Sequence, residues 1–322
     1  MPERPIRIAT RGSALALAQA NMIAAQCRSA FPKLVFELKI IKTTGDKLQK
    51  ASMAKPDATL PKGLFTKELE VALLKGEADL AVHSLKDLPT DLPDGLILAA
   101  TPQRADVRDV LIYRAAGTSA HRGFKPNTQL KDFPKGATIA TSSTRRKAQL
   151  QLVRPDLKIV EIRGNVATRM KKVAEQPELD ATVLALAGIS RLNFTISTDG
   201  KLHGEAVPEG LLATILDVEV MLPCVGQAAI GIEIRANDER IAKICERLNH
   251  LDTFQAVIAE RAFLHGMGGG CQSPVAAYAE IAGTKITMRA VSFRDGPAKR
   301  AEGKRAVKEA VQLGKQLAVE LR

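Results

Sequence analysis

The stretch IATRGS, residues 8–13, decides the fold, because it holds the end of a strand, a polar turn and a helix start. Apolar residues recur at helical spacing over 14–30, and Ser13 is placed to cap that helix. The stretch IATSST, residues 139–144, repeats the pattern before a second helix at 145–153. One strand–turn–helix unit used twice predicts two α/β domains with parallel or mixed sheets.

The other periodic segments belong to these two domains and to a third. Strands are expected at 35–41, 79–83, 158–162, 181–186 and 229–234, and helices at 65–75, 166–173 and 238–248. A helix at 254–265, strands at 276–282 and 285–293, and a final helix from Lys304 to the end follow. We therefore expect a discontinuous first domain of residues 1–103 and 229–248, a second of 107–222 and an α+β third domain of 251–322.

The composition is that of a globular protein with a strong positive charge. Lys and Arg number 47 against 35 Asp and Glu, and the resulting formal charge of +12 suits a polyanionic partner. Aromatic residues make up only 3% and Trp is absent, which disfavours binding of single-stranded nucleic acid by stacking. No apolar run reaches the roughly 20 residues of a membrane span, and the N-terminus lacks a signal-peptide core. Four widely separated cysteines predict reduced thiols, no metal site and a cytoplasmic location.

Two adjacent arginines in the second unit indicate an anion site. Arg145 and Arg146 fall in the first helical turn, where a cation opposes the helix dipole by roughly 0.3–1 kcal/mol. They are either solvated surface residues or ligands of an anion, which the free N–H groups of the helix also favour. Four more arginines lie at or near strand ends: Arg11, Arg163, Arg169 and Arg191. Because guanidinium groups pair bidentately with carboxylates, the set predicts a cleft for a ligand with many carboxylates.

The segment HSLKDLP, residues 83–89, supplies a candidate acid–base group at the end of a strand. Lys86 and Asp87 could form a solvated ion pair of little energetic value. In a cleft rich in arginine, Asp87 could instead stabilise a cationic intermediate and manage protons. His83 by itself favours a structural histidine over a catalytic one.

The loop MGGGCQSP, residues 267–274, places Cys271 on a glycine-rich turn that leaves its side chain uncrowded. The loop alone is typical of a free surface cysteine. The upstream arginines and the Lys-Asp pair favour a second interpretation, in which the thiol carries a group covalently.

Six motifs, in this order, give the chain its resemblance to the porphobilinogen deaminase (hydroxymethylbilane synthase) family. They are TRGS at 10–13, KGLFTKELE at 62–70, HSLKDLP at 83–89, TSSTRR at 141–146, RGNVATR at 163–169 and GGCQ at 269–272. The resemblance implies a transferase of tetrapyrrole (heme) biosynthesis that joins four porphobilinogen molecules head to tail, releases ammonia and hydrolyses the product to hydroxymethylbilane. It also implies two periplasmic-binding-protein-like α/β domains facing a cleft, a third α+β domain, and a monomer.

The resemblance also implies roles for individual residues. Cys271 would hold a dipyrromethane cofactor through a thioether. Asp87 would be the catalytic residue, hydrogen-bonding the pyrrole N–H groups and stabilising the cationic azafulvene left when ammonia departs. The carboxylates of the cofactor would be held by Ser13, Lys86, Ser143, Arg145 and Arg146. Porphobilinogen and the growing chain would be held by Arg11, Arg163, Arg169 and Arg191.

Three segments depart from the family pattern. Residues 58–62, ATLPK, stand where glycines usually precede KGLF, so the role of the 43–62 loop with Lys55 and Lys62 stays open. Residues 226–228, GQA, replace a usual GQG near the domain crossing, and the segment 194–221 is longer than usual and shows no clear period.

Two other function classes stay open. A small-anion binding module would fit two α/β domains rich in arginine, but it explains neither the Cys271 loop nor the third domain. Non-specific nucleic-acid binding would fit the charge of +12 and predicts basic residues on one exterior face.

Overall fold

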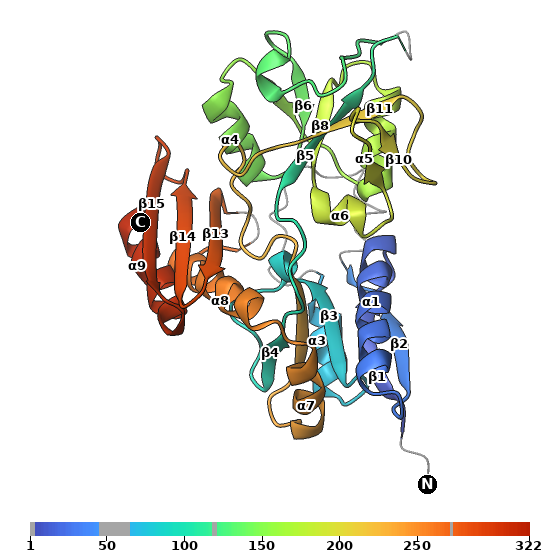
Figure 1. The fold of residues 1–322 in the computed structure, drawn as a ribbon, viewed down its shortest axis with the longest axis vertical. Helices are drawn as coiled ribbons and strands as arrows, with labels where there is room; N and C mark the ends of the chain where they lie inside the picture. The colour runs from blue at the N-terminus through green and yellow to red at the C-terminus, as the bar shows by residue number, and fades with distance from the viewer. Residues whose placement is uncertain (1–3, 45–64, 118–120, 271–272) are drawn as a thin grey trace.

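The computed structural model describes residues 4–44, 65–117, 121–270 and 273–322 of the chain. In Figure 1, two five-stranded mixed sheets with their helices lie one above the other, and a three-stranded antiparallel sheet with two helices lies beside them. The expected class, two α/β domains with mixed sheets and a C-terminal α+β domain, is confirmed. The residue limits of the three domains stay a prediction.

The first sheet has the strand order β2-β1-β3-β12-β4. Its strands are β1 (Ile6–Arg11), β2 (Phe36–Ile41), β3 (Leu80–Ser84), β4 (Leu96–Ala100) and β12 (Ile230–Arg235). β2, β1 and β3 are parallel, whereas β12 runs antiparallel to both β3 and β4. Helices α1 (Ala14–Ala30) and α7 (Glu239–Leu248) pack on one face of the sheet, and α3 (Lys67–Leu74) packs on the other through Leu69 and Leu73.

The second sheet has the order β11-β5-β8-β6-β7. Its strands are β5 (Asp109–Arg114), β6 (Thr138–Ala140), β7 (Lys158–Val160), β8 (Ala181–Ala185) and β11 (Leu211–Ile215). Helix α4 (Thr144–Val153) packs on one face through Leu150, and α5 (Val166–Glu175) packs on the other through Met170. The short helix α6 (Leu186–Ser190) follows β8 directly.

The two sheets are built alike, which explains the repeated sequence unit. In each sheet four strands run in one direction and only one, β12 or β5, runs against them; β1 and β6 both lie in the middle of the three adjacent parallel strands. Residues 101–108 and 216–229 connect the two sheets, so that β12 joins the first sheet although it follows the second in the chain.

Besides the C-terminal strand at 299–306 described below, five strands were not expected from the sequence: β4, β5, β11, β9 (Thr195–Ile196) and β10 (Leu202–His203). β5 is buried along its whole length, so it shows no alternation of polar and apolar residues. β9 and β10 pair as a hairpin within the 194–221 segment. Each strand has only two residues, which is too few to show an alternation of polar and apolar residues.

The third unit comprises α8 (Leu251–Gly266), β13 (Val275–Ala282), β14 (Lys285–Ser292), β15 (Lys299–Ala306) and α9 (Ala310–Leu321). Its core joins Phe263 of α8, Met288 of β14 and Leu313 of α9. The two helices approach so closely at Gly314 that a Cβ there would lie 2.1 Å from the carbonyl oxygen of Ala259.

The expected helix from Lys304 to the end is wrong in its first part. Residues 299–306 form strand β15, which pairs with β14 at eight positions, and the helix begins only at Ala310 after a 3₁₀ turn, Val307–Glu309. The sequence KRAEGKRA is rich in helix-forming residues, but pairing with β14 overrides that preference. Its charged side chains suit the exposed edge of a sheet.

A buried carboxylate joins the third unit to the segments that connect the sheets. Glu260 of α8 is fully buried and binds both terminal nitrogens of Arg104, Nη1 at 2.7 Å and Nη2 at 3.0 Å. It also accepts the backbone N–H groups of Gly226 at 2.8 Å and Ala279 at 3.0 Å. The three units therefore meet at one hydrogen-bonded junction, next to the largest concentration of predicted site residues.

Candidate functional site

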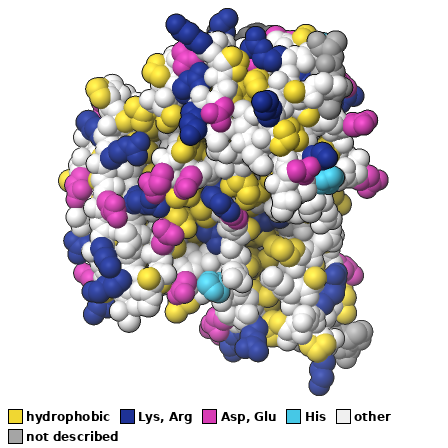
Figure 2. All heavy atoms as spheres, turned by 45° about the horizontal axis from the view of Figure 1, so that its top comes forward, with side chains coloured by type: hydrophobic (Ala, Val, Ile, Leu, Met, Phe, Trp, Pro, Cys, Tyr) yellow, Lys and Arg dark blue, Asp and Glu magenta, His cyan; other side chains and the backbone are white. Residues whose placement is uncertain are grey.

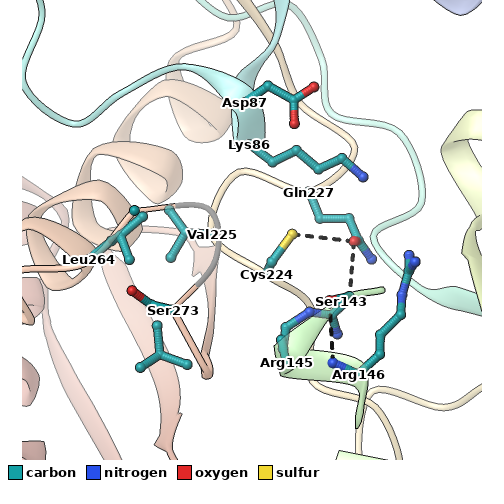
Figure 3. Close-up of a pocket in the computed structure, with 12 residues that line it drawn as sticks. Lys86, Asp87, Ser143, Arg145, Arg146, Cys224, Val225, Gln227, Leu264 and Ser273 are labelled. Atoms are coloured by element: carbon teal, nitrogen blue, oxygen red, sulfur yellow. Dashed lines mark hydrogen bonds between the residues drawn. The ribbon is translucent and has the colours of Figure 1, made fainter. Parts of the chain in front are cut away.

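A cavity of about 160 Å³ lies where the three units meet, and its wall includes residues of each (Figure 3). Lys86 and Asp87 come from the 3₁₀ turn Leu85–Asp87 at the carboxyl end of β3, where open α/β sheets bind ligands. The other lining residues that matter below are Ser143, Arg145 and Arg146 of α4, Cys224 and Gln227 of the connecting segment, and Gly270 and Ser273 of the third unit.

A second, smaller cavity of about 70 Å³ lies at the corresponding turn of the first unit. Arg11, Ser13, Phe65 and His83 line it. Asp87 lines both cavities, so this carboxylate lies between the two candidate anion sites.

The two arginines of α4 have a carboxylate partner within the protein. Nη2 of Arg145 and Nη2 of Arg146 lie 2.8 and 2.7 Å from the two carboxylate oxygens of Asp109, the first residue of β5. All three side chains are buried, with at most 7% of any of them exposed. Nη1 of Arg145 donates to Leu222 O at 2.7 Å and Nη1 of Arg146 to Val183 O at 2.9 Å. Both guanidinium groups are therefore held rigidly before any ligand binds.

The electrostatic balance of this group leaves it positive. Burial by itself would raise the pKa of Asp109, but the charges of Arg145 and Arg146 outweigh burial and hold its pKa well below the ordinary range. One carboxylate thus faces two guanidinium cations. The Nε atoms of both arginines are buried without a hydrogen-bond partner among the described residues. A buried donor without a partner is costly, so this arrangement favours an additional acceptor beside the arginines.

Gln227 holds the group together. Its amide nitrogen donates to Val107 O at 2.7 Å and to Asp109 at 3.0 Å, and its amide oxygen accepts from the thiol of Cys224 at 3.4 Å. Figure 3 shows Gln227 between Cys224 and Arg145, with Lys86 approaching from the opposite side. The connecting segment therefore positions the arginines as well as joining the sheets.

The predicted substrate arginines lie in different surroundings. Arg169 is half-buried, its Nε donates to Gly164 O at 2.9 Å, and burial together with the charge of Arg146 lowers its pKa to about 10. Arg191 is half-buried and donates to Ala228 O at 2.6 Å, and burial lowers its pKa to about 10. The ion pairs within the described ranges include neither of these two. Arg163 is exposed, 3.8 Å from Glu161, and lines neither cavity.

Ser13 caps the first helix as expected, and the structure shows that Ser143 caps the second in the same way. Ser13 Oγ accepts from Ala16 N at 3.3 Å and Ser143 Oγ accepts from Arg146 N at 3.4 Å, so both serines are N-caps. Ser13 lines the smaller cavity with Arg11, whereas the other predicted cofactor ligands, Lys86, Ser143, Arg145 and Arg146, line the larger one. Arg11 stacks on Phe65, with its guanidinium carbon 4.2 Å from the ring centroid.

Comparison with known proteins identifies the family. A family model described as "Porphobilinogen deaminase, dipyromethane cofactor binding domain" matches residues 6–243, and one for the C-terminal domain of porphobilinogen deaminase matches residues 254–322. The chain belongs to the porphobilinogen deaminase family. It is 45% identical to the porphobilinogen deaminase of Syntrophomonas wolfei over 92% of this chain and 88% of that protein. It is 42% identical to that of Geobacter metallireducens over 97% of this chain and 86% of that protein.

Solved structures of other proteins share only part of the architecture. The chain matches the reduced OxyR regulatory domain from Pseudomonas aeruginosa with a TM-score of 0.40 and 15% identity, over 76% of this chain and 94% of that one. It matches the periplasmic sulfonate-binding protein SsuA from Methylobacillus flagellatus with a TM-score of 0.38 and 13% identity, over 81% and 67% of the two chains. So loose a likeness carries no argument about function.

The cavity residues fit the cofactor that the family model names. A dipyrromethane with acetate and propionate groups needs several cationic donors, and the larger cavity offers Lys86 together with the positively charged group of Arg145, Arg146 and Asp109. Cys271, the predicted attachment point, lies outside the described residues. Gly270 and Ser273, the nearest described residues before and after it, line the larger cavity. The roles assigned to individual residues stay predictions.

Three residues of the larger site were missed in the sequence: Asp109, Gln227 and Cys224. In the sequence, Asp109 follows Arg108 and looks like one more solvated charge. Its pairing with Arg145 and Arg146 depends on β5 lying next to the start of α4 in the fold. Gln227 left a usable signal, since the motif GQA at 226–228 was noticed as a departure near the domain crossing.

Proposed function

We propose that the chain condenses four porphobilinogen molecules head to tail on a dipyrromethane primer attached to Cys271, and then hydrolyses the product to hydroxymethylbilane. Each condensation releases one ammonia. Beyond family membership, the observation that carries this proposal is the larger cavity, where Lys86, Arg145 and Arg146 surround a space that Asp87 also lines.

Four residues of the larger cavity hold the carboxylates of the cofactor: Lys86, Ser143, Arg145 and Arg146. Ser13, at the smaller cavity, holds a carboxylate that reaches past Asp87. When bound, the cofactor supplies the pyrrole carbon to which the first substrate is joined. Because Asp109 and Gln227 fix the arginines in advance, little side-chain ordering is needed on binding, which favours affinity.

Asp87 is the catalytic residue. In each step, the C–N bond of the substrate aminomethyl group breaks, and its electron pair leaves with ammonia. Positive charge then develops on the substrate pyrrole, and a carboxylate between the two cavities stabilises that charge and accepts the pyrrole N–H hydrogen bonds.

The remaining arginines bind incoming substrate and the growing chain. Every porphobilinogen brings two carboxylates, so the negative charge of the product rises at each step. Arg11 at the smaller cavity, with Arg169 and Arg191, offers guanidinium groups for these carboxylates. Arg163 would take part only at the outer end of the chain, because it is exposed.

We further propose a cytoplasmic monomer that binds neither nucleic acid nor membrane. Figure 2 shows Lys and Arg side chains spread over the visible face with Asp and Glu among them, which does not favour a single nucleic-acid-binding field. None of the described helices is long and apolar enough to cross a membrane. The most exposed large apolar side chains of the described ranges are Val319 on α9, Leu251 on α8, Ile40 in β2 and Val35 just before β2. Sedimentation with and without DNA tests the monomeric state and the absence of nucleic-acid binding.

Turnover of porphobilinogen tests the proposed activity. Wild-type protein should consume porphobilinogen and release ammonia, whereas Asp87→Asn should keep the cofactor and lose about 10²–10³-fold in kcat, as for other electrostatic stabilisers. Asp91→Asn is the matched control, because Asp91 lies four residues on with 73% of its side chain exposed, and should stay within twofold of wild type. Near-normal turnover by Asp87→Asn would remove it from the mechanism, and no consumption by the wild type would overturn the activity.

A further inference from the structure

Three buried titratable side chains lie together beneath the smaller cavity. His83 on β3, Glu233 on β12 and Glu70 on α3 are 5%, 0% and 7% exposed. β12 pairs with β3, so His83 and Glu233 lie on the face of the sheet that α3 covers. His83 Nε2 lies 2.9 Å from Glu233 Oε2. The described residues hold no group of acidic, His or Cys side chains arranged for a metal ion.

Two carboxylate oxygens of the cluster have no hydrogen-bond partner within the described part of the chain. Oε1 of Glu70 and Oε1 of Glu233 are both buried without a partner in the described ranges. Burial, and secondarily the charge of Glu233, raises the pKa of Glu70, although a hydrogen bond from Thr66 and the charge of His83 act in the opposite direction. Two ionised carboxylates cannot both be buried here without compensation. Glu70 therefore retains a proton more readily than a solvated glutamate does.

Charged groups from the neighbouring elements complete the surroundings. Arg261 of α8 lies near enough for the charge of Glu233 to act on it, but its nitrogens donate to the carbonyls of Leu88 and Pro89. Glu68 of α3 acts on Glu70 through its charge. Asp87 and Arg11 line the smaller cavity together with His83.

The cluster also borders the reaction site. His83 and Thr66 line the smaller cavity together with Asp87, the proposed catalytic carboxylate. A proton that leaves the reacting pyrrole therefore has a nearby imidazole as acceptor, backed by a carboxylate, in the arrangement that orients and strengthens histidine bases elsewhere.

We propose that His83 accepts the proton that each condensation releases, and that Glu233 is the positioning residue that orients and stabilises the resulting imidazolium. The inference rests on the proposed function. In the step, a carbon–carbon bond forms between the pyrrole α-carbon and the substrate methylene carbon. The α C–H bond then breaks, its electron pair returns to the ring, and the proton passes to Nδ1 of His83. Nε2–H of His83 stays bonded to Glu233, and the accepted proton finally leaves with ammonia as ammonium.

The pH dependence of kcat at saturating porphobilinogen separates this role from a structural one. An imidazole must be neutral to accept a proton, so kcat should rise with pH along a limb that depends on the presence of His83. Glu233→Gln removes the charge that stabilises the imidazolium. It should therefore lower kcat at least tenfold with KM within twofold, and move the rising limb of the profile to lower pH.

Two further variants sharpen the test. His83→Gln should abolish that limb. Glu77→Gln, at an exposed carboxylate beyond the end of α3, is the control and should change nothing.

The outcomes distinguish this inference from the proposed function. Unchanged shapes of the pH profiles in His83→Gln and Glu233→Gln, with altered unfolding midpoints only, would show a merely structural tie between β3 and β12 and overturn the inference. If His83→Gln fails to fold, the profile of Glu233→Gln decides alone. A wild type that neither carries the cofactor mass nor consumes porphobilinogen would instead overturn the proposed function.

Discussion

The two strand–turn–helix units of this protein look alike in sequence but have different electrostatic roles. Both begin their helix with a serine cap and both open onto a cavity. In the first unit, Arg11 lies at the strand end and stacks on Phe65. In the second, Arg145 and Arg146 are buried within the helix start and fixed by Asp109. We propose from this difference that the two arginines of the second unit hold the permanent cofactor and that Arg11 of the first unit holds incoming substrate.

Removing the carboxylate of Asp109 in the second unit should give the largest loss of unfolding free energy. Asp109→Asn leaves two buried guanidinium groups without compensation, and breaking a buried ion pair in this way costs about 3–5 kcal/mol. Urea denaturation measures the free energy of unfolding. Asp106→Asn, at an exposed pair with Arg108, is the control and should cost less than about 1 kcal/mol. A similar small loss in both variants would show that Asp109 does not anchor the site.

The same carboxylate predicts a pH dependence. The pKa of Asp109 is lower in the folded state than the ordinary value near 3.9, so its stabilising effect is complete above that value and is lost as pH falls through the folded pKa. The difference in unfolding free energy between wild type and Asp109→Asn should therefore be constant from pH 8 to about 5 and shrink only below about pH 4. A difference that already shrinks at pH 6 would contradict this assignment.

The two serine caps give the smallest expected effects. Ser13→Ala and Ser143→Ala should each cost about 1 kcal/mol in unfolding free energy, because each removes an acceptor from a helix N-terminus. Ser143→Ala should also slow uptake of the cofactor by the apoprotein more than Ser13→Ala does, because only Ser143 lines the larger cavity. Time courses of intact mass after addition of porphobilinogen measure the uptake, and equal rates in the two variants would remove the distinction.

The sequence predicted the features that depend on residues close together in the chain. Ser13 was identified as a helix cap, because the cap and the apolar helix that it begins lie within a few residues of each other. The edge strand β15 was missed, because its partner β14 provides the pairing and its own residues favour a helix. The role of Asp109 could not be predicted, because residues 101–108 and 216–229 must first cross between the sheets to bring β5, α4 and Gln227 together.

The most direct test of the account is the intact mass of variants of the two units. Replacing the ion triad as a whole, with Arg145→Met, Arg146→Met and Asp109→Leu, leaves no uncompensated buried charge, and such replacements are often neutral or stabilising. Urea denaturation should confirm that this variant folds.

The wild type and Arg11→Leu should both exceed the polypeptide mass by two linked pyrrole units, and Cys271→Ser should not. The folded triad variant should show the bare polypeptide mass even after exposure to porphobilinogen. Retention of the excess mass by the triad variant, or its loss in Arg11→Leu, would contradict the assignment of the permanent cofactor to the second unit and of the incoming substrate to the first.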